Sequence, residues 1–264
     1  MYRSNKAYLA IAIGVFAAAC SNDASGPLMQ NDPPAPPPPQ YTTISATGDI
    51  AAKVQEFRTL VGDPNNGATV GPQLQGRREI SWDGAAANPF DNRNDFPAAF
   101  FNTNAKLGAV FTTPGTGFRN DSTDFVDINT EYANEFKSFS PTKIFSPVGS
   151  NVMDVDFELA GQPTPGLVTG FGVVFSDVDV ANQTTIEFFD QRGISLAKIV
   201  APVRSDASGF SFVGAKFPSA IVARARIVLG TAALGANVND ISSGGTYDLV
   251  VADNFIYGEP QPLQ

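Results

Sequence analysis

Hydrophobic and polar residues alternate with a period of two over most of the second half of the chain. In residues 153–159, Met153, Val155 and Phe157 alternate with acidic residues. Successive side chains of a β-strand point to opposite faces, so this pattern predicts a strand with one face in a core and one in water. Further strands are expected at residues 171–175, 184–189, 194–200, 210–212, 215–217, 221–229 and 247–257.

Turn-forming residues separate these expected strands, and no helical pattern lies between them. This arrangement argues against βαβ units and favours strands joined by turns. The link at residues 190–193 is short and polar, so it predicts a hairpin. The sequence therefore predicts a mainly β fold, an antiparallel β-sandwich of jelly-roll-like type. The 21 phenylalanines suit an aromatic core between two sheets.

One short helix near the N-terminal end of the domain is also expected. Apolar residues recur at helical spacing over residues 49–60. Thr47 or Asp49 could cap the start of this helix, and Gly62 can end it. Residues 63–150 are rich in Asn, Gly, Pro and Asp, so long loops with short strands are expected there.

The first twenty residues have the pattern of an export signal. Arg3 and Lys6 precede an uncharged apolar run at residues 7–19. That run is shorter than the roughly 20 residues that cross a bilayer core, but it suits a signal peptide. Small residues then lead to Cys20, which is the single cysteine of the chain. The alternative is an ordinary secretory signal that is cleaved after Ala19.

This small-residue run ending at Cys20 resembles the lipobox of bacterial lipoproteins. The resemblance implies a diacylglycerol on the Cys20 thiol, cleavage before it, and acylation of the new amine. Because a lone thiol cannot form an internal disulfide, lipidation accounts for its presence. Ser21 follows the cysteine, and by the same resemblance this favours the outer membrane over retention at the inner one.

Three regions are expected along the chain. Residues 1–19 form the signal peptide, and residues 20–40 form the lipidated cysteine and a stalk that ends in a proline cluster. Proline-rich chain adopts extended polyproline II at about 3.1 Å per residue, so the stalk is semi-rigid. Residues 41–264 form the β-sandwich domain.

Charge limits the partners that this domain can have. The formal net charge is −9, and removal of residues 1–19 leaves 26 acidic against 15 basic side chains, or −11. An acidic surface repels phosphate backbones, so nucleic acid is not an expected partner. It also argues against a polybasic hold on anionic lipids. Membrane contact is therefore expected through the lipid anchor, with a glycan or surface protein as the other partner.

Several segments together resemble a family of bacterial extracellular β-sandwich proteins, many of which carry C-terminal PEP-CTERM sorting tails. The segments are residues 76–84, 96–102, 115–118, 171–179, 186–190 and 253–255. The resemblance covers nearly all of residues 45–258 and implies a location at the cell surface or in the matrix, with no established activity. At residues 258–262 this sequence ends about where such proteins continue into the sorting tail, and the N-terminal lipid is expected to replace that anchor.

Catalytic chemistry has few candidates in this sequence. The chain has no histidine, which excludes Ser-His-Asp catalysis and imidazole zinc sites. Cys20 is committed to the lipid. Paired carboxylates, as in glycoside hydrolysis, remain as an alternative, although the acids within residues 153–159 alternate with core residues, as on a solvated sheet face. The candidates are Glu79, Asp83, Asp154, Asp156 and Glu158. No enzyme activity is expected.

A calcium site is the cofactor that the sequence suggests. Asp177 and Asp179 lie at the end of an expected strand, and Asp253 on the last strand would join them if the two strands are neighbours. Calcium takes six to eight oxygen ligands from carboxylates, carbonyls and water. The alternative is turn chemistry at a solvated strand end. Trp82 follows Ile80 in period two and is expected in the core, the alternative being a glycan platform.

Three functions remain open at this point. The first is a membrane-tethered surface lipoprotein with a non-catalytic module that binds a glycan, matrix or protein ligand. The second is a structural or packing protein of the envelope without a small ligand. The third is a carboxylate-based glycan hydrolase, which needs two acids roughly 5–10 Å apart in a cleft.

Overall fold

The computed structural model describes residues 37–84, 89–205 and 209–263. Residues 38–264 form one compact unit. The predicted signal peptide, Cys20 and most of the predicted stalk lie outside the described residues. Within the described ranges, no helix is both long enough and apolar enough to cross a membrane.

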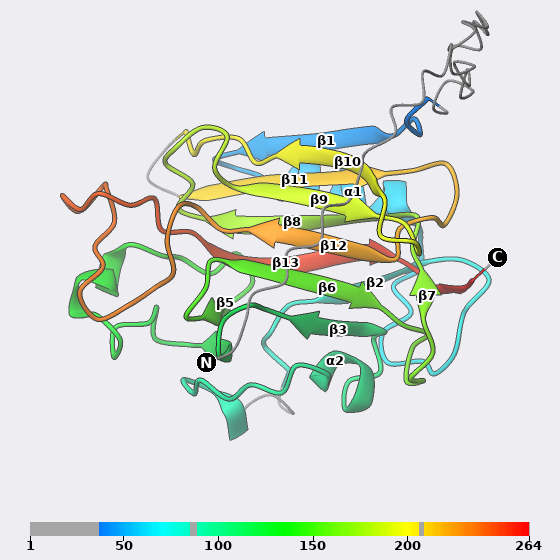
Figure 1. The fold of residues 1–264 in the computed structure, drawn as a ribbon, viewed down its shortest axis with the longest axis horizontal. Helices are drawn as coiled ribbons and strands as arrows, with labels where there is room; N and C mark the ends of the chain where they lie inside the picture. Colours follow the sequence, from blue (N-terminus) through cyan, green and yellow to red (C-terminus); the bar gives the residue numbers. More distant parts are fainter. Residues whose placement is uncertain (1–36, 85–88, 206–208, 264) are drawn as a thin grey trace, which may run out of the picture. The chain divides into compact units, whose positions relative to one another are not determined.

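Two antiparallel sheets face each other in the part of the chain that is described (Figure 1). The larger sheet has the strand order β1-β11-β8-β13-β5-β4, and β2 also pairs with β13. Its strands are β1 (Thr42–Thr47), β2 (Arg77–Ile80), β4 (Gly117–Asp121), β5 (Ile144–Val148), β8 (Gly170–Ser176), β11 (Phe210–Lys216) and β13 (Val251–Gly258).

The smaller sheet has five strands in the order β10-β9-β12-β6-β3. They are β3 (Ala109–Thr112), β6 (Val152–Phe157), β9 (Thr185–Phe189), β10 (Ser195–Val200) and β12 (Arg224–Val228). A short pair, β7 (Gly166–Leu167) and β14 (Gln261–Pro262), stands apart from both sheets. The predicted mainly β, antiparallel sandwich is thus confirmed, and so is the hairpin, because β9 and β10 pair across residues 190–193.

The strand register explains how the smaller sheet separates its core from its surface. Phe188, Ala225 and Val155 lie side by side on β9, β12 and β6, and all three are buried. The neighbouring rows on the same strands point outward and carry charged side chains. The alternation predicted for β6 is confirmed, and the buried rows join residues of the larger sheet in one core between the layers.

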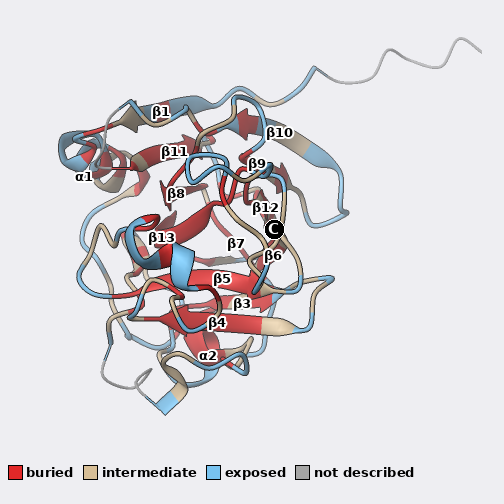
Figure 2. Cartoon of the chain, turned by 90° about the vertical axis from the view of Figure 1, so that its left-hand side faces the viewer, coloured by how far each residue is buried: buried red, intermediate tan, exposed pale blue. Residues whose placement is uncertain are grey.

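The predicted N-terminal helix is present as α1 (Ala51–Val61), and it covers the outer face of the larger sheet (Figure 2). The N-cap residue of the helix is Ile50, whose side chain makes no capping hydrogen bond. The Asp49 carboxylate accepts a 3.3 Å hydrogen bond from the Ala51 N–H. Gly62 follows the helix with φ 132°, a conformation that few other residues adopt. The helix therefore ends where the sequence predicted.

Residues 63–150 contain long loops and short strands, as expected. The apolar pair Phe100-Phe101 belongs to a short helix, α2 (Phe100–Thr103), and a 3₁₀ helix, η2 (Thr130–Asn134), follows later. The sequence analysis missed both helices because one turn of helix is too short to show a period. Trp82 is buried as predicted, with its ring stacked 3.8 Å from Phe145.

Candidate functional site

Two of the three predicted calcium ligands lie together, but an arginine joins them. Asp177 and Asp179 follow the end of β8, and Arg204 forms ion pairs with both carboxylates. Arg204 Nη2 lies 3.2 Å from Asp179 Oδ2. The Asp179 backbone N–H is in turn bonded to Asp248 Oδ1 at 2.8 Å. Two of the residues that the sequence suggested as calcium ligands, Asp177 and Asp179, are thus ion-paired with Arg204 at the end of β8.

Asp253 belongs to a different network. Strands β8 and β13 are neighbours, as the prediction required, but their register pairs Val251 with Ser176, which carries Asp253 away from the end of β8. The Asp253 carboxylate accepts hydrogen bonds from the backbone N–H groups of Phe139 and Ser140 and from the Ser140 hydroxyl. The group predicted from the sequence, Asp177 with Asp179 and Asp253, is therefore not the group that the structure gathers.

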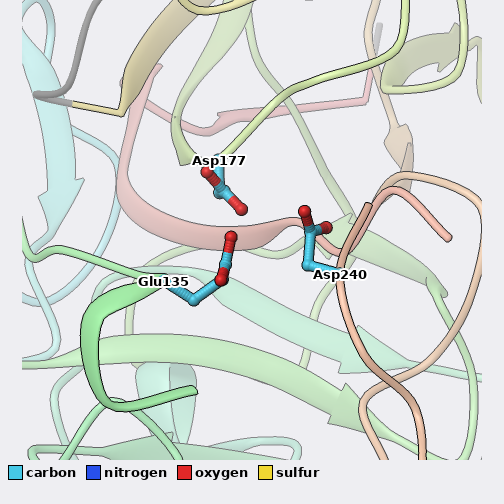
Figure 3. A group of neighbouring side chains, drawn as sticks. All are labelled: Glu135, Asp177 and Asp240. Atoms are coloured by element: carbon cyan, nitrogen blue, oxygen red, sulfur yellow. The ribbon is translucent and has the colours of Figure 1, made fainter. Parts of the chain in front are cut away.

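The structure gathers Asp177 with Glu135 and Asp240, and we call these three residues the acidic cluster. They are buried, and one carboxylate oxygen from each lies within 4.8 Å of the others. In Figure 3 the carboxylates of Glu135 and Asp177 point toward each other, with Asp240 beside them. Three segments far apart in the sequence meet here, the loop after η2, the end of β8, and the loop before β13.

Backbone and side-chain contacts hold these loops against the strand end. The Ser176 hydroxyl accepts a 2.9 Å bond from the Lys137 N–H, which ties the loop after η2 to β8. The Tyr132 hydroxyl donates to the Val238 carbonyl at 2.7 Å and accepts the Gly235 N–H at 3.2 Å, which ties η2 to the loop before β13. A small apolar cluster that includes Tyr132, Phe125 and Leu249 fills the space beneath. The acidic cluster is therefore built on packed segments.

The three carboxylates differ in how they are satisfied. The two oxygens of Glu135 accept bonds from the hydroxyls of Ser242 and Ser243. The two oxygens of Asp240 accept backbone N–H groups, those of Ser242 and Leu249, at 2.7 Å each. Neither oxygen of Asp177 accepts a hydrogen bond from any described residue, although it is fully buried. Its described electrostatic partner is the Arg204 guanidinium.

These environments move the pKa values apart. Burial, and then the close approach of Glu135, raise the pKa of Asp177 to about 9, while Arg204 opposes the rise. Burial also raises the pKa of Asp240 and brings that of Asp248 to about 6. Burial opposes a low pKa at Glu135, but hydrogen bonds from its serine partners and from Asp177 outweigh it and lower the value. In the absence of a cation, Asp177 therefore carries a proton beside an ionised Glu135.

A second feature is the outward face of the smaller sheet, which we call the open face. Two rows of outward-facing residues, mostly polar, run across the five strands, as the register requires. One row contains Ser195, Phe189, Arg224, Asp156 and Val110, and the other contains Lys198, Glu187, Arg226, Asp154 and Thr112. The charges in the second row alternate in sign from β10 to β6, so each basic residue stands next to an acidic one.

Ion pairs and one aromatic ring order the side chains of the open face. Arg226 binds Asp154 through two hydrogen bonds of 2.7 and 2.9 Å. The Arg224 guanidinium lies 4.5 Å from the ring centre of Phe189, within the range of a cation–π contact. The side chains of Arg224 and Arg226 are still 33% and 43% exposed. Both side chains therefore remain partly accessible to solvent.

The carboxylates considered for hydrolysis are engaged in separate contacts. Glu79 binds Arg58 and Asn254, and Asp83 accepts the Ser140 hydroxyl and two backbone N–H groups. Glu158 is bonded to Asn102. Asp154 and Asp156 lie on the open face, where burial raises the pKa of Asp156. The hydrogen bonds of Glu79, Asp83 and Glu158 join neighbouring segments of the fold.

The fold and these features define the chain as a mainly β sandwich protein with an acidic cluster at the end of β8 and a charged sheet face. Comparison with known proteins found no match to a family model, a curated protein or a solved structure.

Proposed function

We propose that this protein is an exported, lipid-anchored surface protein whose β-sandwich is a non-catalytic binding module. The observation that carries the binding part is the open face, where two cross-strand rows present ordered charged groups on a rigid sheet. Binding groups held by packed strands lose little entropy when a ligand arrives. The lipid anchor rests on the sequence pattern that ends at Cys20.

The ligand that fits this face is a polar one with carboxylate and hydroxyl groups, such as an acidic glycan. The terminal N–H groups of Arg224, and those of Arg226 that do not bind Asp154, can donate to such groups. The neighbouring acids Glu187 and Asp156 can accept from hydroxyls. The Phe189 ring is already covered by Arg224, so stacking of a sugar on that ring is not the basis of the proposal.

A glycan array tests the binding proposal directly. Residues 38–264, which form one compact unit, are labelled and applied to an array that includes uronic acid polymers. We expect binding that falls when Arg224 and Arg226 are both changed to Ala. Lys53→Ala is the matched control, because Lys53 lies on α1, which covers the other sheet. No binding on the array, or equal binding by the double variant, would argue for the purely structural alternative.

Lipid labelling tests the anchor. Cells that express the full chain are fed labelled palmitate, and the protein is isolated from the membrane fraction. We expect label in the wild type and in Ser21→Ala, but not in Cys20→Ser, because a serine hydroxyl does not accept the thioether-linked lipid. An unlabelled wild-type protein in the soluble fraction would contradict the anchor.

A further inference from the structure

The acidic cluster carries an inference that is independent of the open face. Its members approach one another from three segments, and each is nearly excluded from solvent. Burial of several carboxylates is costly unless a cation or protons compensate them. Asp179 and Asp248 lie next to the cluster and add to its negative charge. Arg204 supplies one positive charge, which it shares between Asp177 and Asp179.

The second observation is the carboxylate of Asp177 itself. It is fully buried and aimed at Glu135 (Figure 3), and its Oδ2 has neither a hydrogen bond nor an ion pair with any described residue, while Oδ1 faces Arg204. Asp248 Oδ2 is likewise buried without a hydrogen-bond partner among the described residues. Buried acceptors of this kind normally bind a donor, a water molecule or an ion. The ion pair with Arg204 involves Asp177 Oδ1 and leaves Oδ2 without a partner among the described residues.

We propose that Glu135, Asp177 and Asp240 bind a calcium ion that links the two loops to the end of β8. All three ligands offer oxygen, which hard cations prefer, and no histidine exists to favour zinc. Two oxygens on opposite sides of a calcium ion lie about 4.6–5.2 Å apart, because each is about 2.3–2.6 Å from the ion. The three ligand oxygens all lie within 4.8 Å of one another, so they are close enough to share one such ion.

Binding calcium to the folded state alone stabilises it, because the unfolded chain does not bring the three ligands together. The ion would join the loop after η2 and the loop before β13, which are otherwise held by the Glu135–serine bonds and the Tyr132 bonds. The proposal therefore predicts both a binding signal and a stability change.

The test is calorimetric titration of the full chain in detergent with calcium chloride, together with thermal unfolding in millimolar calcium and in chelator. The wild type is expected to bind one calcium ion and to unfold at a higher temperature in calcium. Asp177→Asn and Glu135→Gln are expected to lose the binding heat and the calcium-dependent shift. Asp95→Asn is the control, because Asp95 is an exposed acid whose partner is Arg93, and it should behave as the wild type.

A merely structural role for Asp177 predicts a different result. A structural role through the ion pair with Arg204 predicts that Asp177→Asn unfolds earlier by the same amount in calcium and in chelator. A ligand role predicts that the variant loses the calcium-dependent rise in unfolding temperature that the wild type shows. If that variant does not fold, Glu135→Gln carries the test, since its amide oxygen still accepts a serine hydroxyl. No heat and equal unfolding temperatures in calcium and chelator would overturn the proposal. So would binding that survives in both variants, or an equal response to magnesium.

Discussion

Two buried carboxylates, Asp253 and Asp177, show how strongly local partners decide what an acidic residue does. The Asp253 carboxyl group lies within hydrogen-bond reach of two backbone N–H groups and a serine hydroxyl, and these dipoles oppose the rise in pKa that burial causes. Its own carbonyl accepts the indole N–H of Trp82 at 2.8 Å. Asp177 has no such donors among the described residues. Asp253 therefore has a structural role, whereas Asp177 depends on its ion pair with Arg204 and on the proposed calcium ion.

The pKa of Asp253 leads to a prediction about pH. Burial raises this pKa to about 7, although the bonds from Phe139 and Ser140 oppose the rise. The folded protein thus keeps the proton to higher pH than the unfolded chain, whose aspartates titrate near about 3.9. The contribution of Asp253 to stability is full below the unfolded value and is lost as the pH rises through about 7.

Asp253→Asn removes this titration. We expect the variant to cost stability at acidic pH and to cost less as the pH rises through neutrality, by an amount on the order of a few kcal/mol. Urea unfolding of wild type and variant on both sides of the window measures the difference. A cost that stays constant with pH would show that Asp253 does not titrate in this range.

Sequence reasoning found one member of the acidic cluster and missed the others. Asp177 was found because it directly follows a strongly patterned strand. Glu135 and Asp240 lie in loops without period, and no sequence pattern reports that these loops meet. Asp253 was included only on the condition that the last strand neighbours β8. The structure meets this condition, but a period of two gives neither the pairing of the strands nor the register between them.

At the scale of elements, the contact of α1 with the larger sheet depends on two glycines. Gly172 of β8 and Gly214 of β11 are register partners, and the Phe57 ring of α1 lies on both. A Cβ on Gly214 would lie 2.6 Å from the Phe57 ring, and one on Gly172 would lie 2.7 Å from it. The absence of both side chains makes the slot that accepts the helix.

Gly214→Ala is therefore expected to destabilise the protein. Overpacking of a well-packed contact costs about 1–3 kcal/mol, because a backbone or side chain has to move. Urea unfolding followed by Trp82 fluorescence measures the loss. Gly84→Ala is the control, because a Cβ at Gly84 has no atom within 4 Å. Equal stability of the two variants would mean that α1 shifts on the sheet at little cost.

The strands and α1 were predictable from the sequence because their patterns extend over several residues. The buried strand β8 shows the limit of this reasoning. The pattern at residues 171–175 suggested one face in water, but all of β8 is buried, since α1 covers its outer face and the smaller sheet covers its inner face. Alternation of large and small residues, with Gly172 among the small ones, looks like alternation of core and surface.

At the scale of the whole molecule, all buried apolar residues of the described core lie within one compact unit. The core between the sheets, the cluster under α1 and the cluster beside the acidic residues begin with Ile44 and end with Tyr257. Several strands that are far apart in sequence, such as β2 and β13, pair within this unit. A unit that contains its own core can fold alone.

This arrangement predicts that removal of residues 1–37 leaves stability unchanged. We expect residues 38–264 and the full chain in detergent to unfold within about 2–4 °C of each other, the shift that about 1 kcal/mol causes in a domain of this size. Calcium should raise both unfolding temperatures equally, because the acidic cluster lies in the retained unit. Thermal unfolding followed by Trp82 fluorescence measures both. A fragment that unfolds far earlier than the full chain would show that the N-terminal residues stabilise the sandwich and do not serve only as its tether.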